Sequence, residues 1–259
     1  MKKQVLLSTY SLTQEIIASR YPQSRVSLFW AVFQPFMMLC LYSFIFGIVF
    51  NVRWSTEIDN IYSFALVLFL GLIFHNCLVE NIMSGATLFS KYGNGIKKMN
   101  LSPHMLVIAQ ANANFAFLLL NFAVFFVCFL FLIGPVLLDI PMALATFGVF
   151  YFFNILVVYL SSIFFTFSKA AQNLLNIIPL VLIFISPVLY PISAVPEQFR
   201  GYLYWNPMTL IIQNIRSAFF VGVDANPFGL LMLAGFCCLS FLSFRSISRF
   251  FLRYLPDVI

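Results

Sequence analysis

Long apolar runs separated by short polar connections dominate the chain. Crossing a bilayer as a helix takes about 20 mainly apolar residues, and six runs reach or approach that length. These runs cover residues 26–50, 61–83, 105–138, 142–167, 171–192 and 227–248. The pattern predicts an all-α membrane protein with six transmembrane helices, and residues 1–259 are treated as one transmembrane domain.

Residues 1–25 precede the first predicted span and are amphipathic. Apolar side chains recur there at helical spacing, which is typical of a short helix lying in the membrane surface. The residues on that line are Leu6, Tyr10, Thr13 and Ile17. A solvated lead-in segment fits the same pattern, so the interface helix remains one of two interpretations.

The stretch from Ser186 to Arg216 breaks the apolar pattern between the fifth and sixth spans. Pro187, Pro191 and Pro196 crowd into its first half, and Pro207 follows. Each proline removes a backbone donor and clashes with the preceding turn, so one continuous helix is excluded. The stretch is nevertheless apolar and aromatic. Residues 193–223 are therefore predicted to form a re-entrant hairpin at the outer face; an extramembrane loop with an aromatic belt is the alternative.

Composition places the chain in the membrane. Of its 259 residues 62% are hydrophobic and 8% charged, whereas soluble domains carry roughly 25% charged residues. The net charge of +6 does not indicate a nucleic-acid partner, because the basic residues lie at the ends of apolar runs. The five cysteines lie inside apolar runs and are interpreted as small hydrophobic residues rather than disulfide or metal ligands.

The Lys and Arg distribution predicts the orientation. With both termini in the cytoplasm, only Arg53, Arg200 and Arg216 of the 14 basic residues lie on the outer side. Six spans satisfy this bias, whereas seven would place the C-terminal arginines outside. The longest connections are then the inner loop at residues 84–104 and the outer hairpin, where function is expected.

Catalytic and nucleotide motifs are weak. Gly93 to Lys98 is glycine-rich and basic, but it lacks the spacing and the Ser/Thr of a phosphate-binding loop. Residue 82 is Ile where an intramembrane serine protease motif at Ser84-Gly85 needs Gly, which argues against proteolysis. Nucleotide, if it drives this protein, is expected to bind to another chain.

Polar residues inside the spans are few. Ion-coupled transport requires ionisable groups in mid-membrane, and the second span offers His75, Asn76 and Glu80. A satisfied structural pair near the membrane boundary is the favoured interpretation of Glu80. Early in the third span stand polar residues that fit either interhelical hydrogen bonds or the lining of a wet passage; they are Gln110, Asn112 and Asn114.

Three segments carry a resemblance to a known family. Residues 20–35, RYPQSRVSLFWAVFQP, resemble the entry to the first span in membrane subunits of ABC transporters that export polysaccharides, with matches at Arg20, Tyr21, Gln23, Ser24, Trp30 and Pro35. The inner loop is similar through Lys97, Lys98 and Pro103. The hairpin is similar through Ser186-Pro187, Tyr190-Pro191, Val195-Pro196-Glu197 and Asn206-Pro207. Ser27 and Gln34 depart from the family's usual Gly and Asn, which leaves the substrate branch open.

The resemblance implies a type-2 ABC exporter permease of the O-antigen and lipopolysaccharide export group, similar to capsule and teichoic acid exporters. Such a chain is not itself an enzyme: it forms a homodimer in the bacterial inner membrane and docks two ATP-binding subunits, which hold the ATP and Mg²⁺. The passenger would be an undecaprenyl-linked polysaccharide moved from the cytoplasmic to the outer face. No metal or other cofactor is expected in this chain.

The resemblance also assigns roles to residues. Residues 84–104 become the coupling loop, with the ATPase contact at Lys91, Lys97, Lys98 and Met99. Within the interface helix, residues 1–25, the assigned residues are Arg20 and Tyr21. Candidate conduit residues are Phe29, Trp30, Phe33, Phe36, Phe184 and Tyr190. Candidate outer-gate residues are Pro196, Tyr202, Tyr204, Trp205, Asn206 and Pro207.

Two alternatives stay open at this stage. The first is an exporter of the same architecture that carries teichoic acid, capsule or a drug-like substrate. The second is a membrane channel or scaffold that does not use ATP. Co-purification with an ATPase, and stimulation of its turnover in liposomes, separates the second from the first.

Overall fold

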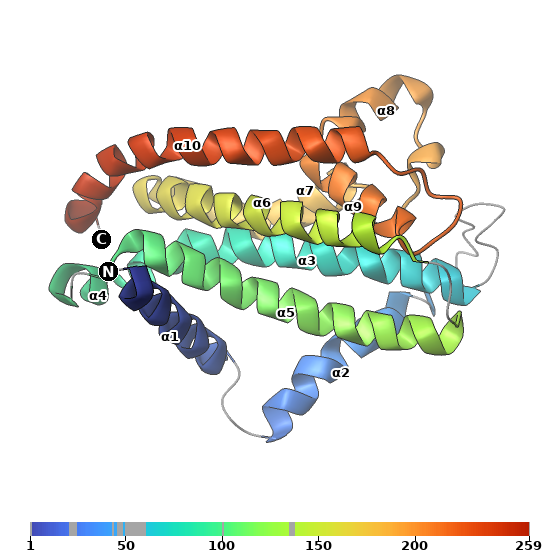
Figure 1. The fold of residues 1–259 in the computed structure, drawn as a ribbon, viewed down its shortest axis with the longest axis horizontal. Coiled ribbons are helices and arrows are strands. Elements are labelled where there is room, and N and C mark those ends of the chain that lie inside the picture. Colours follow the sequence, from blue (N-terminus) through green and yellow to red (C-terminus); the bar gives the residue numbers. More distant parts are fainter. Residues whose placement is uncertain are drawn as a thin grey trace.

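The computed structural model describes residues 2–20, 25–42, 44–45, 49, 61–99, 101–134 and 138–258. All regular elements within these ranges are helical, which confirms the all-α prediction (Figure 1). In chain order they are α1 (Lys2–Arg20), α2 (Arg25–Tyr42), α3 (Ile61–Lys91), α4 (Gly93–Met99), α5 (Pro103–Leu132), α6 (Ile140–Phe167), the 3₁₀ helix η2 (Lys169–Asn176), α7 (Ile178–Ile185), the 3₁₀ helix η3 (Ile192–Ala194), α8 (Glu197–Tyr204), α9 (Pro207–Ser217) and α10 (Pro227–Val258).

The long helices lie side by side along the long axis of the molecule. Helix α3 packs against α5 and α6, and α6 packs against α10. The start of α1, the end of α10 and α4 lie at one end of this bundle, whereas α7, α8 and α9 gather toward the other (Figure 1). The loop between α3 and α5 and the pair of α8 and α9 therefore lie toward opposite ends of the bundle.

Three helices in the described part of the chain are long and apolar enough to cross a membrane. They are residues 62–91, 103–132 and 140–167, and shorter apolar helices cover 33–42 and 227–241. Most of the apolar window of α3 is buried, 78%, compared with 17% for α5. Helix α3 is thus the central helix, around which the others pack.

Several helix ends differ from the predicted spans. Helix α3 continues beyond residue 83 to Lys91, so the first part of the expected 84–104 loop is helical. Helix α2 covers Arg25–Tyr42, and the described residues 44, 45 and 49 beyond it are π-helical. No single helix runs through 171–192: η2 covers the start and α7 follows. Pro179 explains the second start, because it lacks the N–H that would continue a preceding helix and suits a helix's first turn.

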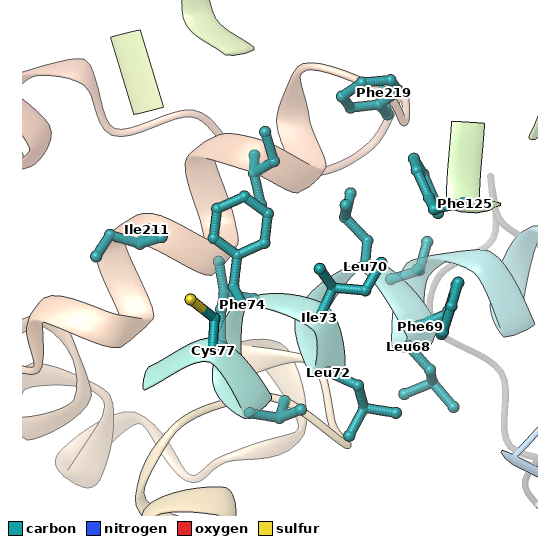
Figure 2. Packing of buried hydrophobic residues seen from close by; sticks show 14 of the residues in the cluster. Leu68, Phe69, Leu70, Leu72, Ile73, Phe74, Cys77, Phe125, Ile211 and Phe219 are labelled. Atoms are coloured by element: carbon teal, nitrogen blue, oxygen red, sulfur yellow. The ribbon is translucent and has the colours of Figure 1, made fainter. Parts of the chain in front are cut away.

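Two apolar cores fill the bundle. One lies toward the α9 end and includes the rings of Phe74, Phe125 and Phe219 (Figure 2). The other lies toward the α1 and α4 end and includes Leu12 and Phe89. Between the two cores lies a layer of buried asparagines, one each from α3, α5 and α6. They are Asn81, Asn114 and Asn154.

Close packing of α3 on α6 depends on Gly85. A Cβ added there would lie 2.9 Å from the Val158 carbonyl oxygen and 3.0 Å from the Cβ of Ser161, both on α6. Small residues at such a crossing let two helix backbones approach closely. Because the obstructing atoms belong to the backbone and to a Cβ, a side chain at 85 would force the helices apart.

We therefore expect Gly85→Ala to destabilise the protein by about 1–3 kcal/mol, the usual cost of overpacking. The measurement is the thermal unfolding midpoint of the detergent-solubilised protein. Gly235→Ala on α10 is the matched control, since no atom lies within 4 Å of its added Cβ. A Gly85→Ala midpoint equal to that of the control would contradict the role of Gly85.

Candidate functional site

The proline-rich stretch folds into a helical hairpin made of α8 and α9. None of the described side chains of α8 is buried, whereas most of α9 is; its buried residues are Met208, Thr209, Leu210, Ile211, Ile212, Asn214, Ile215 and Arg216. Helix α9 packs against α3, α6 and α10. A short helix is thus inserted into the protein, and α8 lies on the surface beyond it.

Side chains satisfy backbone carbonyls that the broken helix leaves exposed. The Tyr190 hydroxyl donates to the Phe184 carbonyl at 2.7 Å. The side-chain amide of Asn206 donates to the Ile185 carbonyl at 3.4 Å and also to the Ser186 hydroxyl at 3.1 Å. Arg200 donates to the carbonyls of Val195 and Ser193, at 2.8 and 2.9 Å. Inside a membrane, irregular backbone is tolerated only where its polar groups have such partners.

Arg216 is the most buried of these donors, with 2% of its surface exposed. Its Nη1 donates to the Pro187 carbonyl and its Nη2 to the Val188 carbonyl, each at 2.7 Å. Its Nε donates to the Val67 carbonyl on α3 at 3.0 Å. Arg216, which the distribution of basic residues places on the outer side, is therefore buried within the protein, and its side of the membrane stays a prediction.

The predicted gate residues divide into two groups. Tyr202, Tyr204 and Trp205 project from α8 and its end, and Trp205 is 88% exposed. Asn206 and Pro207 instead build the start of α9, where the Asn206 side chain accepts from the Met208 amide at 2.9 Å. Pro196 precedes the first residue of α8. The list that follows from the sequence therefore mixes exposed aromatic rings with residues that shape the backbone.

The predicted conduit aromatics on α2 form a cluster. Phe29 stacks on Phe33 with 5.0 Å between ring centroids, and Trp30 meets Phe33 edge-on at 5.4 Å. Phe29, Trp30 and Phe36 are exposed. At helical spacing, Phe29, Phe33 and Phe36 share one face of α2. The other two candidates lie elsewhere: Phe184 is exposed on α7, which packs on α3 and η2, and Tyr190 follows it.

The inner loop is largely helical. Lys91 ends α3, exposed, with its Nζ 5.5 Å from the centroid of the Tyr92 ring. Lys97 is exposed on α4, whereas the side chains of Lys98 and Met99 lie outside the described part of the structure. Burial raises the pKa of the Tyr92 hydroxyl, and the negative charge of Glu15 on α1 raises it further. Helices α1 and α4 thus border the same end of the bundle.

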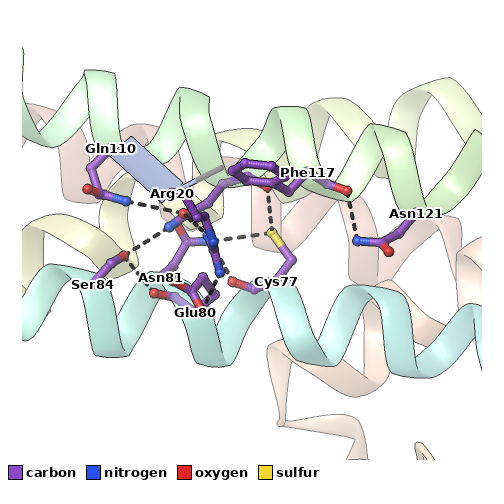
Figure 3. Close-up of polar contacts among 9 residues, drawn as sticks. Arg20, Cys77, Glu80, Asn81, Ser84, Gln110, Phe117 and Asn121 are labelled. Atoms are coloured by element: carbon purple, nitrogen blue, oxygen red, sulfur yellow. Dashed lines mark hydrogen bonds and ion pairs between the residues drawn. The ribbon is translucent and has the colours of Figure 1, made fainter. Parts of the chain in front are cut away.

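A polar network joins α1 to α3 and α5 (Figure 3) and reaches α6 through Asn154. Arg20 at the end of α1 pairs with Glu80 on α3, with 2.9 Å between Nη2 and Oε2. Its Nη1 donates to the Asn114 side chain at 3.3 Å, and its guanidinium lies 4.7 Å from the centroid of the Phe117 ring. Tyr21, the other residue assigned to the interface helix, lies outside the described residues.

Asn114 is the centre of this network. It accepts from Gln110 at 3.2 Å and donates to Asn81 at 2.9 Å and to Ser84 at 3.0 Å. Asn81 donates onward to Asn154 on α6 at 2.8 Å. The interpretation of Glu80 as a satisfied structural pair and of Asn114 as an interhelical hydrogen-bonding residue is therefore confirmed. Asn112 likewise accepts from the Tyr151 hydroxyl at 2.7 Å.

A cavity of about 340 Å³ opens beside this network, between α2, α3 and α5. Polar, charged and apolar side chains all line it. The polar residues include Arg20, Gln34, Asn76, Glu80, Asn114 and Asn121. Helix α2 presents Gln34 and Met38 to the cavity, which lie on the opposite helical face from Phe29 and Phe33.

Sequence reasoning missed Asn81, Asn154 and Gly71. The asparagines carried a signal, since an amide inside an apolar span usually pairs with another helix. Gly71 carried no such signal. Its lack of a side chain matters because a Cβ there would collide with Nη2 of Arg216, which is far away along the chain.

We expect Asn114→Ala to destabilise the protein by about 1–3 kcal/mol, because it leaves buried polar partners unsatisfied on α3 and α5. It should also speed amide hydrogen exchange in α1, since Arg20 loses one of its contacts. Asn121→Ala is the matched control, because Asn121 is on the same helix and its side chain donates to the Phe117 carbonyl of that helix. Equal unfolding midpoints and equal α1 exchange would contradict this account.

Comparison with known proteins agrees with these observations. The family of ABC-2 type transporters matches residues 8–220 of the chain. Two curated proteins of Escherichia coli, both named Polysialic acid transport protein KpsM, are 30% identical over 77 residues, which is 29% of this chain and 30% of theirs. The aligned part thus spans about a third of the length of these relatives. The family match covers most of the chain, from within α1 to just beyond α9, and the chain belongs to the ABC-2 type transporter family.

Proposed function

We propose that this chain is the permease subunit of an ABC transporter that exports a lipid-linked polysaccharide, O-antigen, from the cytoplasmic to the outer face of the bacterial inner membrane. The working unit is a homodimer with two ATP-binding subunits, and both termini lie in the cytoplasm. ATP and Mg²⁺ bind to the partner subunits. The passenger is carried on an undecaprenyl lipid.

The observation that carries this proposal is the inserted hairpin. Helix α9 is buried yet too short to cross a bilayer, and it is followed by a return to the bundle through α10. Irregular backbone at membrane depth is found where it is buried in protein or lines a water-filled path. In the proposed transporter it borders the outer end of the path, and α8 is the element that closes it.

Exposed aromatic rings suit a sugar polymer. Tyr202 and Trp205 on the hairpin, and Phe29 and Trp30 on α2, are exposed on this chain. Aromatic faces contact the apolar C–H faces of sugar rings without a fixed hydrogen-bond pattern, so a polymer slides over them rather than lodging. The polysialic acid named for the KpsM relatives is also a saccharide polymer, which supports this passenger class.

The end of the molecule that bears α1 and α4 is proposed as the ATPase contact. Lys91 and Lys97 are exposed there, and α4 is a short helix that stands out from the bundle (Figure 1). The Arg20 network then connects α1 with α3, α5 and α6. Movement of an ATP-binding subunit against this end would be transmitted to the rest of the bundle through the packed helices.

The proposal is tested by reconstitution. The chain, purified together with its ATP-binding partner, is placed in liposomes that contain undecaprenyl-linked O-antigen, and the polymer reaching the far leaflet is measured with a sugar-binding lectin. We expect ATP-dependent transfer. Transfer of polysialic acid or teichoic acid instead would favour the same architecture with another passenger, and the absence of any ATPase partner would favour a channel or scaffold.

Reversing Lys97 and Lys98 to Glu should reduce both recovery of the ATP-binding subunit with this chain and export, because the proposed contact loses two positive charges. Lys97→Arg with Lys98→Arg is the control, since it changes the same two side chains but keeps both positive charges. Unchanged export and recovery in the Lys97 and Lys98 variant would remove α4 from the contact.

A further inference from the structure

Arg216 joins three parts of the chain that are distant in sequence. Its guanidinium donates to carbonyls on α3 and on the break after α7, while its backbone belongs to α9. The planar guanidinium offers five N–H donors in a fixed arrangement, which a lysine ammonium does not reproduce. We call this arrangement the Arg216 clasp: Arg216 with the carbonyls of Val67, Pro187 and Val188.

Gly71 makes room for the clasp. In a helix each Cβ points back toward the N-terminus and covers the preceding turn, so a side chain at 71 would cover the Val67 carbonyl. A Cβ added at Gly71 would collide with Nη2 of Arg216 and lie 3.1 Å from its Cζ. A free arginine would swing aside at little cost, but this guanidinium is buried and held by three carbonyls.

The segment beyond the clasp is closed on itself. Residues 189–205 start directly after Val188, which the clasp holds, and end at Asn206, whose amide donates to Ser186 at 3.1 Å. Within the segment, Arg200 donates to two carbonyls of the η3 region, which braces it internally. Helix α8 lacks buried residues, unlike α9. The base is therefore fixed, and the tip is attached by few contacts.

We propose that Arg216, seated against Gly71, is a positioning residue for the outer hairpin. The clasp binds α9 and the break after α7 to α3 as one unit, so that residues 189–205 are the part that moves as a lid during transport. The lid movement rests on the proposed function. The unit of α9, the break and α3 rests on the hydrogen bonds of the clasp. Gly71 is the second residue on which the unit depends.

The test is hydrogen exchange measured by mass spectrometry on the full chain in phospholipid nanodiscs. Arg216→Lys keeps the positive charge but removes the planar guanidinium with its fixed set of donors. Amide exchange in peptides covering 185–190 and 207–217 should therefore rise about tenfold or more, as expected for losing a charge-assisted hydrogen bond. Gly71→Ala should give a similar local rise. Gly148→Ala on α6 is the matched control, because its added Cβ meets no atom within 4 Å.

The double variant Gly71→Ala with Arg216→Lys separates the clasp from general packing. If the alanine acts by displacing the guanidinium, the double variant exchanges no faster than Arg216→Lys alone. Fully additive effects, a Gly71→Ala variant that behaves like Gly148→Ala, or equal loosening of α5 and α6 would each overturn the proposal.

A functional readout completes the test. With the ATP-binding partner present, Arg216→Lys should lower export severalfold while recovery of the partner stays unchanged, since α4 is remote from the clasp. Unchanged export with a loosened α9 would overturn the positioning role. Absence of export by the unaltered chain would instead contradict the proposed function and leave the exchange result standing on its own.

Discussion

Unsatisfied backbone carbonyls are the constraint on which this structure depends. A chain that breaks its helix inside the membrane exposes carbonyl groups that neither lipid nor a following helical turn satisfies, and each costs several kcal/mol. Here the break after α7 is completed by donors from side chains, above all by Arg216. A buried arginine is costly in itself, so its bonds and the hairpin's backbone depend on each other.

The same logic operates at the other end of the bundle. Arg20 and Glu80 neutralise each other beside a buried asparagine layer, and Asn114 links that layer to α1. Apolar cores lie on either side of it along the bundle, and the cavity beside α2 borders it. The molecule thus has two buried polar networks that join its helices. The Arg20 network lies near the proposed ATPase contact, the Arg216 clasp lies near the proposed outer gate, and aromatic and aliphatic side chains pack between them.

Comparing pattern with structure shows which residues are predictable. The prolines at 187, 191 and 196 correctly excluded a continuous helix, because their effect on the backbone is local. The fifth span was expected at 171–192, but the polar start of that stretch and Pro179 divide it into η2 and α7. Arg216 was placed on the outer side by the order of the spans, and counting charges along the chain does not show that its side chain is buried against α3.

The sequence by itself determined that the protein is helical and membrane-embedded, where the helix breaks, and at which end basic residues gather. These features follow from local rules of hydrophobicity, proline geometry and charge. Only the tertiary structure decided that Arg216 reaches Val67, which is 149 positions away, and that Gly71 must lack a side chain for it to do so. Such contacts depend on helix rotation and packing, which no periodicity in one helix specifies.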